Sequence, residues 1–258
     1  MSEEILKALM QLFAIIAKQD SGVASNEREY VKNFLTQQLS EEQSKEYFSL
    51  FEKHAEWGDE EEGDSETKKV RLTKVTDSVR TLGICRKINK TLTQNQKIVA
   101  LVRLFELINA DRNFSEQRIA IINTVAEVFN VSHEEFKSIE TFVIKNEPSE
   151  INDPHVIIVN DKDKSGNHCK HIKTEKLDTN IFILRIPSVE LYFLKYTGEE
   201  DLFLNGLALN NKRIYLFANG STVKLPKGKP IYYSDVAAHF LADIHANKIS
   251  FVSVFLLP

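Results

Sequence analysis

Apolar residues recur at intervals of three and four along the first half of the chain, which is the spacing of one helix face. The pattern is clearest over residues 5–17, 98–108 and 119–129. Ser40-x-x-Gln43 and Thr93-x-x-Gln96 have the form of capping boxes, in which two side chains satisfy free backbone N–H groups at a helix start. We therefore expect about seven helices in this half of the chain.

Beyond Pro148 the helical period gives way to short runs of β-branched and aromatic residues separated by Gly, Asn, Asp and Pro. A short helix is expected over Ser234–Ile244 and a final strand over residues 248–256. The sequence thus predicts an α+β chain in two segments, with an all-α bundle over residues 1–147 and a small, mostly antiparallel β-sandwich over residues 148–258. The other predicted strands cover residues 156–159, 181–186, 191–196, 202–204, 213–217 and 222–225.

Composition bears on whether the protein binds nucleic acid and on the cellular compartment in which it works. The net charge of the 258 residues is −4, which gives no whole-chain electrostatic case for nucleic acid, so we expect no nucleic-acid partner. Two cysteines, Cys85 and Cys169, favour a reducing compartment over a disulfide framework. The start lacks a signal peptide's basic and apolar regions, and no apolar run is long enough to form a transmembrane segment. We expect a cytoplasmic protein, with peripheral attachment to a membrane left open.

The helical half contains an internal repeat. Residues 16–27 and 108–117 each hold an apolar helix end, an Asp, a short loop with one apolar residue, a Ser N-cap and a new helix. The loop Asp can accept backbone N–H bonds at the following helix start, where negative charge is also favoured. The sequence therefore predicts two similar helix–loop–helix units, centred on Asp20 and Asp111.

On this repeat, on Ala110-Asp111 and on the ending over residues 125–136, the first 145 residues resemble the TerB-like tellurite-resistance family. The resemblance implies acidic loop residues that are able to hold a divalent cation, whereas the residues by themselves imply no cofactor. The same residues also fit a purely structural role as caps and turns, which a nearby positive charge on Arg118 favours, and both interpretations stay open. The implied metal positions are Asp20, Glu27, Asp111 and Glu116.

Two further resemblances concern the second half. Residues 201–206 and 214–225 resemble the closing strands of forkhead-associated domains, which implies a forkhead-associated-like fold. Residues 184–188, 192–196 and 227–236 resemble the region ahead of the ATPase in certain bacterial ABC-transporter ATP-binding proteins. The sequence has no Gly-x-x-x-x-Gly-Lys-Ser/Thr loop of its own to cradle phosphates. The resemblance therefore implies a protein partner, an ABC-transporter ATPase or membrane complex.

No histidine, serine or cysteine falls in a recognisable nucleophile–base motif, so we expect a protein that is not an enzyme. The leading hypothesis is a non-catalytic regulatory or scaffolding protein that docks a partner and is associated with an ABC-transporter ATPase. The alternative is a metal-binding stress-response protein that acts through the acidic helix–loop–helix units. The sequence leaves the oligomeric state undetermined.

A candidate partner-binding face follows from the alternation along residues 189–196. It places Tyr192 and Tyr196 on one side of the strand, and Tyr232 and Tyr233 extend this face if their loop folds back. Tyrosine suits interfaces because it buries a large area and keeps a hydrogen-bonding tip. The alternative is that a helix of the same chain, Ser234–Ile244, covers the face.

Overall fold

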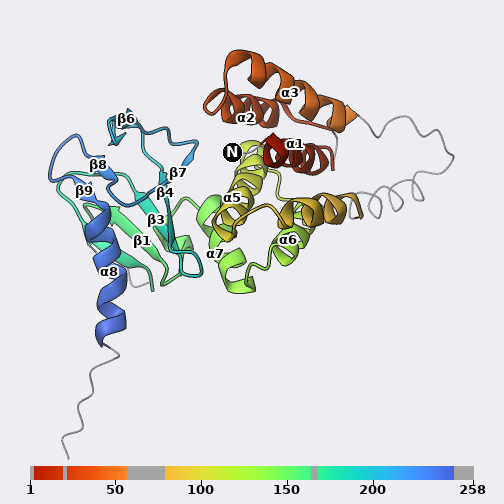
Figure 1. Cartoon of the computed structure of the whole chain (residues 1–258). Coiled ribbons are helices and arrows are strands. Elements are labelled where there is room, and N and C mark those ends of the chain that lie inside the picture. Colours follow the sequence, from red (N-terminus) through yellow and green to blue (C-terminus); the bar gives the residue numbers. More distant parts are fainter. Residues whose placement is uncertain (1–2, 20–21, 57–78, 164–167, 247–258) are drawn as a thin grey trace, which may run out of the picture. The chain divides into compact units, whose positions relative to one another are not determined.

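The computed structural model describes residues 3–19, 22–56, 79–163 and 168–246 (Figure 1). The chain divides into two compact units, Met1–Ile144 and Lys145–Pro258. This division lies close to the predicted boundary between residues 147 and 148. The acidic stretch 57–66 and the predicted final strand 248–256 lie outside the described residues.

The first unit is all-helical, as the periodicity predicts, with seven helical segments among its described residues. Residues 79–89 form one of them. The other six are α1 (Glu3–Ala17), α2 (Ser25–Thr36), α3 (Glu41–Glu56), α5 (Gln94–Asp111), α6 (Glu116–Val128) and α7 (His133–Ile144).

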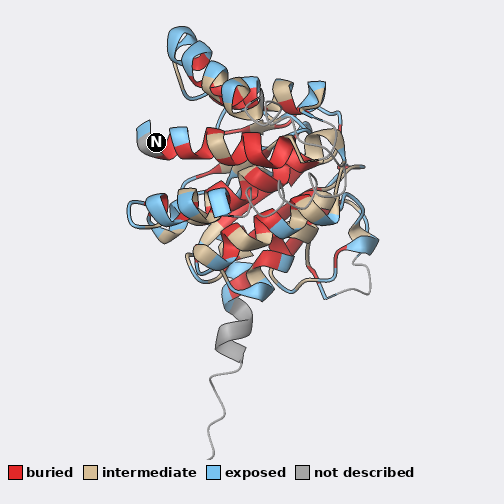
Figure 2. Cartoon of the chain, turned by 90° about the vertical axis from the view of Figure 1, so that its right-hand side faces the viewer, coloured by how far each residue is buried: buried red, intermediate tan, exposed pale blue. Residues whose placement is uncertain are grey.

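Helix α1 is the centre of this unit and is buried on nearly every side. It packs against α3, α5 and α6. In Figure 2 the helix that starts beside the N label is red along most of its length. A helix that is apolar all round is stable in water only when other helices surround it. Its buried side chains are Ile5, Leu6, Ala8, Leu9, Met10, Leu12, Phe13, Ala14, Ile15, Ile16 and Ala17.

Side-chain caps define where several helices begin. Thr93 and Gln96 form the predicted capping box, since the Thr93 N–H donates to Gln96 Oε1 over 2.9 Å and the Gln96 N–H donates to Thr93 Oγ1 over 3.4 Å. Ser115 caps α6 as predicted. In α2 the N-cap is Ala24, one residue before the expected Ser25. Ala24 has no side chain that could cap α2, but Glu27, three residues later, accepts the Ala24 N–H over 2.9 Å, as the acid of a capping box does.

The second unit contains two sheets that share one core with a helix. One sheet has the order β2-β1-β3-β4-β7 and the other β6-β5-β8-β9. β1 and β2 are parallel, and every other pair is antiparallel. The bounds are η1 (Pro148–Glu150), β1 (Val156–Asn160), β2 (Lys170–Lys173), β3 (Ile181–Ile186), β4 (Leu191–Tyr196), β5 (Phe203–Leu204), β6 (Leu207–Ala208), β7 (Ile214–Leu216), β8 (Thr222–Lys224), β9 (Ile231–Tyr232) and α8 (Tyr233–Ala246).

The shared core explains why the two sheets pack together. Ile183 and Leu194 come from the first sheet, Val223 from the second, and Val236 and Phe240 from α8, and all five are buried in one apolar cluster. This arrangement is the predicted small, mostly antiparallel sandwich, with α8 over the residues expected to be helical. The α+β assignment in two segments is therefore confirmed.

Candidate functional site

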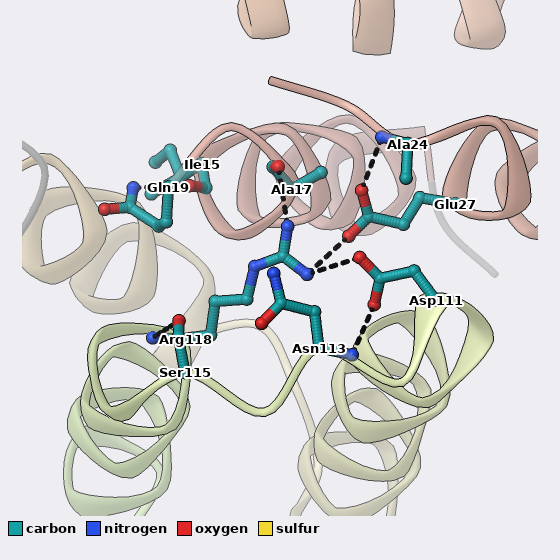
Figure 3. A network of polar contacts seen from close by, with 9 residues as sticks. All are labelled: Ile15, Ala17, Gln19, Ala24, Glu27, Asp111, Asn113, Ser115 and Arg118. Atoms are coloured by element: carbon teal, nitrogen blue, oxygen red, sulfur yellow. Dashed lines mark hydrogen bonds and ion pairs between the residues drawn. The ribbon is translucent and has the colours of Figure 1, made fainter. Parts of the chain in front are cut away.

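The two acidic loops converge on one buried arginine. Arg118 Nη1 forms ion pairs with Glu27 Oε1 at 3.1 Å and with Asp111 Oδ2 at 2.9 Å, and Arg118 Nη2 donates to the carbonyl oxygen of Ala17 over 3.0 Å (Figure 3). The side chains of Arg118 and Glu27 are 1% and 0% exposed, and that of Asp111 is 10% exposed. We call these four residues the arginine cluster.

The remaining carboxylate oxygens of the arginine cluster are also engaged. Glu27 Oε2 accepts the Ala24 N–H, and Asp111 Oδ1 accepts the Asn113 N–H over 3.0 Å. Each acid therefore holds its own loop with one oxygen and reaches Arg118 with the other. The charges of the two acids are thus compensated by the guanidinium of Arg118, as the burial of ions requires.

Glu27 and Arg118 occupy equivalent positions in the two repeats. Glu27 lies three residues after the α2 N-cap, Ala24, and Arg118 lies three residues after the α6 N-cap, Ser115. The predicted repeat is thus visible at the level of single positions, but its two copies carry opposite charges at this one. Because the charges are opposite, Arg118 of the second copy neutralises Glu27 of the first.

Helix ends contribute to the electrostatics of the cluster. Glu27 lies in the first turn of α2, where the helix dipole favours a negative charge. Asp111 and Ala17 are the last residues of α5 and α1, and helix C-termini carry partial negative charge. The negative charge of Asp111 is unfavourable at the C-terminus of α5. The positive charge of Arg118, which lies beside Asp111 and the Ala17 carbonyl, compensates for this.

Of the four predicted metal positions, the structure brings two together. Glu27 and Asp111 lie close together, and both form ion pairs with the guanidinium of Arg118. Glu116 is exposed to solvent. Asp20 lies outside the described residues. Within the described ranges no group of three or more His, Cys, Asp or Glu side chains is placed to hold a metal ion. Metal binding by these residues stays a prediction.

A second buried polar group joins α2 to α5. The Tyr30 hydroxyl donates to Glu106 Oε2 over 3.0 Å, and Arg103 forms an ion pair with the same oxygen. Burial, followed by the nearby Glu106 carboxylate, raises the pKa of Tyr30 well above its usual value. The tyrosine therefore remains a neutral donor, and this group acts as a structural tie between two helices.

Residues 6–141, just over half of the chain, match the family described as tellurite resistance protein TerB. The chain belongs to the TerB family. The TerB region includes both acidic loops and the whole arginine cluster. No curated protein and no solved structure matches the chain. Among the described helices of the TerB region and of the second unit, none combines the length and hydropathy that crossing a bilayer requires.

Outside the TerB region, the structure corrects the expectation of an exposed tyrosine face. Tyr192 and Tyr196 are buried in the core of the second unit. The ring of Tyr192 contacts Phe240 and Tyr233 of α8 at centroid distances of 5.8 and 5.1 Å. At Tyr192 the face is therefore covered by a helix of this chain, α8, which was the alternative interpretation. Burial also raises the pKa of Tyr192 to about 12.

The remaining two candidate tyrosines differ from one another. Tyr233 is the first residue of α8, is half-buried and contacts Phe217 as well as Tyr192. Tyr232 is 48% exposed at the end of β9. Tyr232 is the only one of the four that offers a partner a mostly free side chain, and its role in partner binding stays a prediction.

Lys195 is a buried residue of the second unit that is not among the residues predicted to be functional. It lies in β4, and its ammonium group donates to the Lys145 carbonyl oxygen and to Asn146 Oδ1. The Phe182 ring lies 5.2 Å from Lys195 Nζ. Burial lowers the pKa of Lys195 to about 7. A lysine inside an otherwise apolar strand was the available signal.

Proposed function

We propose that this TerB-family chain is a non-catalytic regulatory or scaffolding protein that docks a partner protein through its second unit, a forkhead-associated-like domain. Support comes first from the arginine cluster. Its carboxylates are buried and engaged on both oxygens, which suits a rigid framework more than a group that must bind and transform a substrate.

The observation that carries the docking proposal is the exposed edge at β6. In the cross-strand register Leu207 pairs with Leu204, Leu204 with Val223, and Val223 with Ile231. Paired residues point to the same face of a sheet. The inner three are buried in the core, whereas Leu207 is 76% exposed. The row of apolar side chains therefore continues beyond the buried core to Leu207 on the edge strand β6.

An edge strand with free backbone groups and an apolar side chain is a template for pairing with another chain. Among the described strands, β6 pairs with β5 alone, and both of its residues are exposed. A partner strand added to β6 would bury Leu207 and extend the sheet by main-chain hydrogen bonds. Because β6 has two residues, an added strand can form few main-chain hydrogen bonds, and the contact should be of modest affinity.

We propose an ABC-transporter ATPase as the partner. The proposal rests on the resemblance of residues 184–188, 192–196 and 227–236 to the region ahead of the ATPase in certain ABC-transporter proteins. These residues include β4 and the beginning of α8, which surround the core of the second unit. Such a partner would bring the chain to the cytoplasmic face of a membrane without a transmembrane helix.

Affinity purification from the native cells, followed by identification of the proteins recovered, tests this proposal. The wild-type chain should recover an ABC-transporter ATPase. Leu207→Asp should lose it, because a charge in the added interface would be buried without a partner. Leu241→Asp is the matched control, since Leu241 is a 48% exposed leucine on α8, outside the β6 edge.

Thermal midpoints separate loss of docking from loss of folding. Both aspartate variants should keep the wild-type midpoint, because exposed leucines contribute little to the core. The docking proposal fails if the ATPase is absent from wild-type samples. The β6 assignment fails if Leu207→Asp recovers the ATPase as well as Leu241→Asp does.

A further inference from the structure

Three oxygen atoms from three different helices converge within the TerB region. They are Glu27 Oε1 of α2, Asp111 Oδ2 of α5 and the Ala17 carbonyl oxygen of α1 (Figure 3). Two carboxylates and a main-chain carbonyl form the kind of oxygen set that Ca²⁺ or Mg²⁺ takes in proteins. In this chain the guanidinium of Arg118 lies among them.

We propose that Arg118 takes the place of a divalent cation, so that the two loops of this TerB chain are closed by an internal guanidinium and need no metal. The inference concerns the arginine cluster alone and is independent of the docking proposal. It assigns to Arg118 the task of holding the first repeat against the second.

The geometry of the side chain supports this assignment. A guanidinium is planar, carries its donors in a fixed fork and stays charged at every relevant pH. Here Nη1 serves both carboxylates while Nη2 serves the Ala17 carbonyl, so a single side chain reaches all three helices. A flexible point charge such as a lysine ammonium would not present two nitrogens in these directions.

Burial makes exchange for a metal unfavourable. Arg118 is 1% exposed, so a cation could enter only if the guanidinium left its partners and moved to solvent. The two carboxylates would also keep their second oxygens on the Ala24 and Asn113 N–H groups, which limits the oxygens left for a metal. Hard cations take about six or more oxygen ligands, so a metal at these three oxygens would need several water ligands, and the space for them opens only when the Arg118 side chain is removed.

The decisive experiment compares thermal midpoints in EDTA with those in millimolar Ca²⁺, Mg²⁺ or Mn²⁺. For the wild-type chain we expect the same midpoint in all four conditions and no saturable heat of binding by calorimetry. Arg118→Ala should lower the midpoint in EDTA, because it leaves two buried carboxylates without a counter-charge. A divalent cation should then raise the midpoint of this variant.

Two control variants complete the test. Arg118→Ala combined with Asp111→Asn should lose the response to metal, because one of the two charged ligands is neutralised. Arg112→Ala should behave as wild type, since Arg112 is exposed at the C-cap of α5. If Arg118→Ala fails to fold, the wild-type measurements still test the proposal, because it requires the wild-type midpoint to be the same with and without divalent cations.

The proposal is overturned if a divalent cation saturably raises the wild-type midpoint and Asp111→Asn removes that effect. It is equally overturned if Arg118→Ala is as stable as wild type in EDTA. A folded but destabilised Arg118→Ala variant that no divalent cation stabilises would show that Arg118 does not stand at a cation position.

Discussion

Glu27 and Arg118 occupy the same position in two different helices, the third residue after the N-cap, and they form a 3.1 Å ion pair closed to solvent. The fold therefore brings these two equivalent positions of the internal repeat into contact. Two acids at these positions would repel, whereas an acid and a base attract. The two copies differ in charge at this position, and the resulting ion pair holds them together.

Glu27→Gln should lower the free energy of unfolding by about 3 kcal/mol. This is the lower end of the range for breaking a buried ion pair, because the amide keeps some of the hydrogen bonds. Urea denaturation followed by circular dichroism measures the change. Glu29→Gln, an exposed neighbour on the same helix, should change stability by less than about 0.5 kcal/mol. Equal losses for the two variants would contradict the role given to Glu27.

Tyr192→Ala and Tyr196→Ala should each destabilise the second unit by about 3 kcal/mol or more, as expected when a large buried ring is removed. Differential scanning calorimetry should show the thermal midpoint of that unit falling by about 10 °C or more. Tyr232→Ala should leave the midpoint nearly unchanged, since Tyr232 is exposed. A stable Tyr192→Ala chain would restore the interpretation of Tyr192 as a docking residue.

The helical half illustrates what sequence periodicity can establish. Apolar spacing identified the helices, and the Thr93–Gln96 box was correct in both partners. The short strands were harder. β2 covers Lys170–Lys173, which are mostly polar and incompletely buried, and its parallel pairing with β1 depends on the tertiary fold. No local pattern in these four residues indicates a strand.

The site was only partly predictable for a related reason. The TerB-like resemblance named Glu27 and Asp111 as metal positions, and the structure places both of them against Arg118. Arg118 was visible as a nearby positive charge, seven residues after Asp111. Its contact with Ala17, 101 residues earlier, depends on how the two repeats pack. One sequence contains no signal for such a distant pairing.

Lys195 should give the protein a distinctive stability profile in alkaline solution. Its pKa is about 7 when folded and near its usual 10.5 when unfolded, so between these pH values the unfolded chain binds more protons. Its contribution to stability therefore rises with pH across this window, by up to about 1.4 kcal/mol per pH unit. Below pH 7 the full cost of burying the charge is present.

The Lys195 contribution can be isolated by comparing variants. Urea denaturation at several pH values from 7 to 10 should show a shallower rise for Lys195→Met than for wild type. Lys212→Met, a change at an exposed lysine, should keep the wild-type slope. Identical slopes for Lys195→Met and wild type would mean that Lys195 does not titrate in this range.

Both cysteines should be unreactive in the folded protein. Cys85 and Cys169 are buried, and burial raises the pKa of the Cys85 thiol to about 12, so almost no thiolate forms near neutral pH. Ellman's reagent at pH 8 should therefore modify neither thiol within minutes. Two thiols should react after addition of guanidinium chloride. Rapid modification without denaturant would show that one of these core regions opens readily.

The position of α1 at the centre of its unit has a consequence for synthesis on the ribosome. α1 is made before α3, α5 and α6, yet it depends on all three to cover its apolar surface. The Arg118 that binds the end of α1 follows 101 residues later. At about 5–20 residues per second this delay lasts roughly 5–20 s. Since α3 follows α1 soon in the chain, the apolar surface that stays uncovered during this time is the part that α5 and α6 cover in the folded protein, and chaperones that bind apolar segments would act on that part.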